Sequence, residues 1–203
     1  MSTKPLALMI AIGLGVAAPM SSSLAVVSDS PAAQSTAADA VSQANPFFAR
    51  SPLEYQYPQF DKINNEHYRP GFEEGMRQQR AEIDVIANDP AAPTFENTIV
   101  AMEKSGQVLA RTSTVFYYLI GSNKNDEMEK IESEMSPKLS AHNDAIVLDG
   151  KLFARVKTLY DNRDKLGLNT EQKRLLWRYH TDFVRSGAQL DDSAKEKLKA
   201  MNS

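Results

Sequence analysis

The sequence TFENTIVAMEKSGQVLARTSTVFYYLI, from Thr94 to Ile120, decides the fold class. Its apolar and small residues recur at alternating intervals of four and three, which is the spacing of one face of an α-helix. These positions are Phe95, Ile99, Met102, Gly106, Leu109, Ser113, Phe116 and Ile120. We therefore predict one long helix that follows a Thr94 cap and stops at Gly121. The small residues Gly106 and Ser113 should let another helix approach closely.

The same helical period continues on both sides of this stretch. Further helices are expected from His67 to Asp89, Asp126 to Asp149, Leu152 to Gly167, Asn169 to Gly187, and from Asp191 or Asp192 onward. Asp126 with Glu129 and Asn169 with Gln172 have the spacing of capping boxes. No segment alternates with a period of two for long enough to predict a strand. The predicted fold class is all-α, and because the connections are short, neighbouring helices should pack antiparallel, as in a bundle.

Residues 1–25 have the features of a signal peptide. Lys4 supplies a short positive region, and Leu6–Ala18 is an apolar stretch too short for a comfortable membrane span. Small residues allow cleavage after Ala25. A membrane anchor is the alternative interpretation. We expect an exported, periplasmic protein without membrane attachment after cleavage.

Three further segments follow the predicted cleavage site. Residues 26–44 are rich in Ala, Ser, Asp and Gln without an apolar period, which is typical of a disordered linker. Residues 45–66 combine three prolines with several aromatic residues, so we expect an extended arm on the surface of a helical body. Residues 67–203 should form the helical domain.

Composition excludes several classes of function. The chain of 203 residues has a net charge of −3 with acidic and basic residues well mixed. Without a basic stripe or a polybasic segment, neither nucleic acid nor anionic lipid is an expected partner. The sequence contains no cysteine, which excludes disulfides, thiolate zinc ligands and cysteine nucleophiles.

The three histidines do not form a recognisable metal site. His67, His142 and His180 are far apart in sequence, and none begins H-E-x-x-H, the spacing that places two imidazoles on one helix face. A site assembled from distant helices is the alternative. We expect structural roles: a helix-opening hydrogen bond for His67, a core or edge position for His142, and a surface position for His180.

No other pattern predicts catalysis. There is no G-x-S-x-G nucleophile turn and no phosphate-binding glycine loop after residue 25. The carboxylate clusters favour a solvated helix face; they are Glu73 and Glu74, and Glu127, Glu129, Glu132 and Glu134. Tyr117, Tyr118 and Trp177 could line a peptide channel, although core positions are the more common role of such aromatics. The sequence therefore predicts no catalytic, cofactor-binding or metal-binding residue.

Several blocks nevertheless resemble a known family in order and spacing from residue 45 to residue 203. The most specific is APTFENTI, Ala92–Ile99, and others are FEEGM at Phe72–Met76, AMEKSG at Ala101–Gly106, PKLSAH at Pro137–His142, LFAR at Leu152–Arg155 and FVRSGA at Phe183–Ala188. They resemble the N-terminal region of bacterial peptidyl-dipeptidases, which belong to the thimet oligopeptidase family of zinc metallopeptidases.

The resemblance implies a two-lobed, largely helical enzyme with a deep channel. Zinc is held on the C-terminal half by H-E-x-x-H and a later glutamate, and the motif glutamate activates water. Short unfolded peptides are the substrates, and C-terminal dipeptides are released. This chain stops before that half begins, so we expect a truncated portion that forms a channel wall, binds no zinc and is inactive alone. Its missing partner is the C-terminal catalytic half.

Three alternatives remain at this stage. The endo-acting oligopeptidase branch of the family is one. A non-catalytic exported helical module that binds peptides is the second, and a purely structural interaction domain is the third. Truncation predicts a large exposed apolar surface where the missing half would pack, because a soluble monomer rarely shows such a surface.

Overall fold

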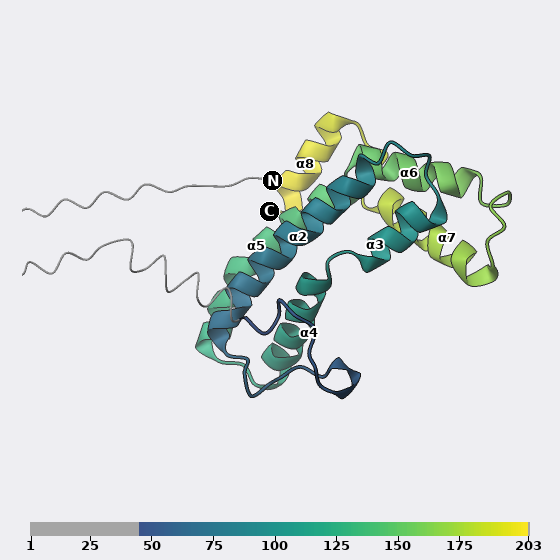
Figure 1. Cartoon of the computed structure of the whole chain (residues 1–203). Coiled ribbons are helices and arrows are strands. Elements are labelled where there is room, and N and C mark those ends of the chain that lie inside the picture. The colour runs from purple at the N-terminus through teal and green to yellow at the C-terminus, as the bar shows by residue number, and fades with distance from the viewer. Residues whose placement is uncertain (1–44, 203) are drawn as a thin grey trace, which may run out of the picture.

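The computed structural model describes residues 45–202, and every regular element in that range is helical (Figure 1). The longer helices are α2 (Tyr68–Ala87), α4 (Gln107–Ser122), α5 (Asp126–Val147), α6 (Gly150–Asp161), α7 (Thr170–Arg185) and α8 (Asp192–Asn202). The short elements are the 3-10 turns η1 (Glu54–Gln56) and η2 (Asn65–His67), the π-helix η3 (Phe95–Val100) and α3 (Ala101–Lys104). The predicted all-α fold class is confirmed for this range, and none of these helices is long and apolar enough to cross a membrane. The predicted signal peptide (1–25) and linker (26–44) lie outside the described residues.

Helix α2 joins two separate hydrophobic clusters. Its 20 residues span about 30 Å, and Figure 1 shows it running from the α4 end of the molecule to the α6 end. The first cluster surrounds its N-terminal half and contains Phe47, Tyr68, Phe72, Val115, Phe116, Met128, Ile131 and Met135. The second surrounds its C-terminal half and includes Ile83, Ile86, Ile99, Met102, Leu152, Val156, Leu159, Leu176 and Phe183. The periodically spaced apolar residues of the sequence therefore form two hydrophobic cores rather than one.

The closest helix pair is α2 with α4, which are antiparallel. A Cβ atom added to Gly75 would lie 2.7 Å from the Leu109 backbone, and one added to Gly71 would lie 2.8 Å from Thr112 Oγ1. The rings of Phe72 and Phe116 pack edge to face beside this contact, with centroids 5.3 Å apart. Gly106 allows a close approach as predicted, because a Cβ atom there would lie 2.6 Å from Cδ of Gln79 on α2; Gly71 and Gly75 allow the approach from the other helix.

Helices α2 and α5 are parallel, because two chain reversals separate them. Arg69 at the start of α2 binds Glu127 and Glu134 at the start of α5, both at 2.7 Å, and Arg80 near the end of α2 binds the Ala145 carbonyl. The predicted antiparallel packing of helices that follow one another in the chain holds for α2 with α4 and for α6 with α7. The prediction did not address α2 with α5, which are separated by η3, α3 and α4.

The predicted long helix from Thr94 to Ile120 is interrupted. Thr94 caps it as expected, accepting from Asn97 N at 3.0 Å, but the chain leaves the helix at Ser105 and Gly106. Gly106 has a φ of 69°, a left-handed conformation that glycine adopts without a steric cost. Its N–H donates to the Glu82 carboxylate at 2.7 Å, so α2 fixes the break.

Two other boundaries differ from prediction. Helix α5 is capped by Asn125, whose side chain accepts from Met128 N, and not by Asp126. Helix α6 ends at Asp161 instead of continuing to Leu166. The Asn169–Gln172 capping box of α7 is present as predicted, with bonds of 2.9 and 3.1 Å.

Residues 45–66 lie along α2 and α4 with only two short 3-10 turns. Asn45 and Phe47 are buried, and Asn45 donates to the His67 carbonyl at 2.8 Å. The other aromatic residues of this arm are mostly exposed, including Tyr55, Tyr57 and Phe60. A single aromatic side chain, Phe47, therefore anchors the arm to the first cluster.

Candidate functional site

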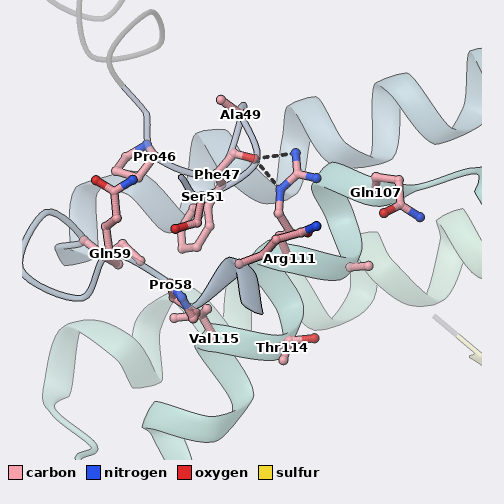
Figure 2. A pocket seen from close by; sticks show the side chains of 13 residues that line it. Pro46, Phe47, Ala49, Ser51, Pro58, Gln59, Gln107, Arg111, Thr114 and Val115 are labelled. Atoms are coloured by element: carbon pink, nitrogen blue, oxygen red, sulfur yellow. Dashed lines mark hydrogen bonds between the residues drawn. The ribbon is translucent and has the colours of Figure 1, made fainter. Parts of the chain in front are cut away.

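A hollow lies between the arm and α4. It has a volume of about 310 Å³. The arm contributes one wall and α4 the other (Figure 2). The lining residues are Pro46, Phe47, Ala49, Ser51, Gln56, Pro58, Gln59, Ile63, Gln107, Ala110, Arg111, Thr114 and Val115. We call it the arm hollow; it combines an apolar floor with amide and hydroxyl groups.

Arg111 is the charged group of the arm hollow. Its guanidinium donates from Nε and Nη2 to the Phe47 carbonyl at 3.0 and 2.9 Å (Figure 2). Burial lowers the pKa of Arg111, and the neighbouring positive charge of Arg50 lowers it further. Within residues 45–202, neither arginine takes part in an ion pair. Sequence reasoning missed both residues, because nothing in their spacing distinguishes them from surface arginines.

A second, more open hollow of about 440 Å³ adjoins the first on α4. It is lined by Ser113, Thr114, Tyr117 and Tyr118, and Thr114 lines both hollows. The side chains of Tyr117 and Tyr118 are 44% and 77% exposed. Trp177, on α7, is 48% exposed. Core positions are therefore wrong for these three aromatic residues, and the structure leaves them on the surface.

The structure does not bring the three histidines together. His67 Nδ1 accepts from Asn64 N at 3.1 Å, which closes the capping box of η2. His142 is half-buried and hydrogen-bonds Gln79 at 2.8 Å; burial lowers its pKa, and the positive charge of Arg80 lowers it further. Both arrangements agree with the predicted structural roles.

His180 differs from its predicted surface position. It stacks on Tyr160 with ring centroids 3.9 Å apart and lies 5.9 Å from the Phe153 ring. Burial is the main cause that lowers its pKa, with the Asp161 carboxylate acting in the opposite direction. His180 therefore belongs to the contact between α6 and α7. Over residues 45–202, no group of three or more potential metal ligands is present.

The carboxylate clusters lie on a solvated face, as predicted, and within residues 45–202 all of their members except Glu132 take part in ion pairs. Lys138 binds Glu73 at 2.9 Å and Glu134 at 3.3 Å, which links α2 to α5. Arg77 binds Glu74 through two hydrogen bonds of 2.7 Å and lowers the pKa of that carboxyl to about 2. Exposed pairs of this kind contribute little each. The lowered pKa values of Glu74 and Glu134 are thus explained by their arginine and lysine partners.

The APTFENTI block is held by a buried arginine from the LFAR block. Arg155 donates to the Asp89 and Ala91 carbonyls at 2.8 and 3.1 Å. It also reaches the side chains of Asp89, Asn97 and Thr98 at 3.1 to 3.3 Å. Arg155 therefore holds the connection between α2 and η3, and the polar side chains of the APTFENTI block that it contacts have a structural role.

The chain is similar in sequence to one part of a longer bacterial protein. It is 45% identical over 158 residues to dipeptidyl carboxypeptidase of Escherichia coli (strain K12), a match that covers 78% of this chain and 23% of that protein. The protein of the same name from Salmonella typhimurium is 44% identical over the same length. Oligopeptidase A of Escherichia coli is 23% identical over 143 residues, 70% of this chain and 21% of that protein.

These matches confirm the resemblance seen in the sequence blocks. The chain is homologous to a portion of dipeptidyl carboxypeptidase and is more distantly related to oligopeptidase A. It spans about a quarter of the length of these curated relatives. No protein-family model matches the chain.

Proposed function

We propose that this chain is a portion of an exported zinc-dependent peptidyl-dipeptidase that hydrolyses short peptides and releases C-terminal dipeptides. The observation that carries the proposal is the 45% identity to a protein named dipeptidyl carboxypeptidase. The 23% identity to oligopeptidase A favours the dipeptide-releasing branch over the endo-acting branch. In this proposal zinc and its ligands are supplied by other residues of the longer protein.

The helical unit serves as a wall of the peptide channel in this proposal. Two properties of residues 45–202 support that role. Helix α2 packs closely against α4 at Gly75, and the ion pairs of Arg69 and Lys138 connect it to α5, so it has neighbours on both sides. The exposed aromatic residues of the arm and of α4 give the unit an apolar surface that suits contact with peptide or with the remaining protein.

A chimera tests the proposed activity. The 158-residue homologous part of the Escherichia coli dipeptidyl carboxypeptidase is replaced by the matching residues of this chain. The chimera should release a C-terminal dipeptide from an N-blocked tetrapeptide, detected by mass spectrometry, and a zinc chelator should abolish the release. The chain of 203 residues alone should release none.

The control is the recipient protein with its homologous part deleted, which should be inactive. A folded chimera that retains zinc but releases no dipeptide would overturn the proposal. In that case a non-catalytic module that binds peptides becomes the better interpretation of the chain.

Export to the periplasm is the second part of the proposal. It rests on the positive and apolar segments within residues 1–25. Fusion of the chain to a reporter enzyme that is active only after export tests it, with a chain that begins at Val26 as the control. N-terminal sequencing of the exported protein should begin at Val26; a reporter that is equally active without residues 1–25 would contradict the proposal.

A further inference from the structure

The arm hollow has the size and lining of a small ligand site. Its volume of about 310 Å³ is at the lower end of the range for ligand pockets, about 300 to 1,000 Å³. The buried side chains of Phe47 and Val115 contribute to its apolar lining, together with Ile63. The amides of Gln56 and Gln107 add hydrogen-bonding groups on opposite walls. A hollow of this size accommodates one apolar side chain with a short polar end.

The charge at the hollow is positive and unbalanced. Arg111 is half-buried, yet its hydrogen bonds within residues 45–202 go to a neutral acceptor, the Phe47 carbonyl. Arg50 adds a second positive charge from between two lining residues, Ala49 and Ser51. Arg155, the buried arginine of the second cluster, is by contrast paired with the Asp89 carboxylate at 3.3 Å.

An anion is the expected complement of this charge. Taking a charged group out of water is costly unless an opposite charge or hydrogen bonds compensate it. Arg111 Nη1 makes no hydrogen bond within residues 45–202, so the edge of the guanidinium that carries Nη1 is available to a carboxylate. Arginine binds carboxylates well because its planar N–H groups match the two carboxylate oxygens.

The second hollow extends the site along α4. Because Thr114 lines both hollows, a ligand in the arm hollow can continue directly over Tyr117 and Tyr118. Exposed tyrosine rings offer apolar contact area together with a hydroxyl group. The combined surface therefore suits an elongated ligand with an anionic, apolar end.

From this geometry we infer that the arm hollow binds the C-terminal residue of a peptide. The α-carboxylate lies at Arg111 and Arg50, the last side chain fills the apolar floor, and the preceding residues pass over Tyr117 and Tyr118. The inference rests on the proposed function only in taking peptides as the ligands. It assigns this chain a binding site of its own.

Equilibrium binding to the whole chain tests the inference. The probe is a pentapeptide of four alanines and a C-terminal phenylalanine with a fluorophore at its N-terminus, measured by fluorescence anisotropy. Replacing the free carboxylate with an amide should weaken binding about 10-fold, because hydrogen bonds to charged groups are the stronger class. Equal affinity of the acid and the amide would overturn the inference, as would the absence of binding to a folded chain.

Two variants test whether the peptide binds in the arm hollow. Arg50→Gln should weaken binding of the acid about 2- to 5-fold, the range for an exposed charge, and leave the amide unchanged. The matched control is Arg174→Gln, an exposed arginine on α7, which should bind both peptides as the unsubstituted chain does. Arg111 itself is retained because it also holds the Phe47 carbonyl.

The second variant blocks the junction of the hollows. Thr114→Trp should abolish measurable binding, because Thr114 is exposed and lines both hollows. Its control, Ala154→Trp, places the same side chain on an exposed position of α6 and should have no effect. Unchanged binding by Thr114→Trp would overturn the inference.

The outcome is separable from that of the chimera experiment. Binding needs neither zinc nor hydrolysis, so a chain that fails to bind while the chimera is active would contradict only the inference. A chain that binds with the expected carboxylate dependence while the chimera is inactive would support the inference and contradict the proposed activity.

Discussion

The buried guanidinium of Arg155 should be the largest single polar contribution to the stability of this unit. Arg155→Met keeps much of the side-chain volume but removes every donor. It leaves the Asp89 and Ala91 carbonyls, the Asp89 carboxylate and the Asn97 amide oxygen without their shared partner. Removing one partner of a buried ion pair costs about 3 to 5 kcal/mol.

The lower end of that range applies here. The Asp89 side chain is 26% exposed, so water can solvate its carboxylate after the substitution. We expect a loss of about 3 kcal/mol in the free energy of unfolding. With a urea dependence of about 2 kcal/mol per M, the unfolding midpoint should fall by about 1.5 M, measured by circular dichroism of the whole chain.

A matched variant and a local measurement make this test specific. Arg178→Met removes an exposed arginine that lies 3.6 Å from Asp182 on the same helix, and it should change stability by less than about 0.5 kcal/mol. Amide hydrogen exchange in Arg155→Met should increase most over residues 88–98, the segment that Arg155 holds. A loss below about 1 kcal/mol, or one equal to that of Arg178→Met, would refute the structural role of Arg155.

Four further predictions concern stability and metal binding. Gly75→Ala should cost about 1 to 3 kcal/mol in urea unfolding, because the new Cβ would meet the Leu109 backbone at 2.7 Å; a neutral effect would contradict the close packing of α2 and α4. Asn169→Ala should cost about 1 kcal/mol through the lost cap of α7, whereas Asn169→Asp should retain most of it. Burial lowers the pKa of His142 below 6.5, so the unfolded state binds more protons and stability should fall as the pH drops through about 6.5. In His142→Gln the urea midpoint should fall less between about pH 7.5 and 5.5 than in the unsubstituted chain. The same pH dependence of the midpoint in both proteins would contradict this prediction. Finally, the chain of 203 residues should retain no stoichiometric zinc after dialysis, measured by atomic emission; one zinc per chain would contradict the structural roles assigned to its three histidines.

Local sequence signals predicted the helices well where one short-range interaction decides the boundary. Thr94 and Asn169 each cap a helix by accepting from a backbone N–H three residues later, which the sequence spacing already indicates. The cap of α5 was missed by one residue, because Asn125 and Asp126 are both good capping residues. Only the backbone conformation of Asn125, φ −138° and ψ 166°, distinguishes them.

Features set by tertiary contacts were beyond the sequence pattern. The apolar period runs without interruption through Gly106, yet the chain breaks there because Glu82 on α2 accepts its N–H. The parallel arrangement of α2 and α5 likewise depends on how two intervening segments turn, which apolar spacing does not encode. Aromatic residues gave a similar error: Tyr117 lies next to the buried Phe116, but one position along a helix turns the side chain by about 100° toward solvent.

Arg111 in the arm hollow differs from Glu74 and Arg155 because no opposite charge is paired with it within the described residues. Glu74 has a lowered pKa because Arg77 pairs with it, and the buried Arg155 has Asp89 as its counter-charge. Each is complete within the described residues and needs no ligand. Arg111 is partly buried, has a positive neighbour and lines an apolar cavity, but its hydrogen-bond acceptor within residues 45–202 is a neutral carbonyl. A carboxylate-terminated peptide supplies the negative charge and the apolar side chain together, which is why the acid-against-amide comparison is the most informative measurement on this chain.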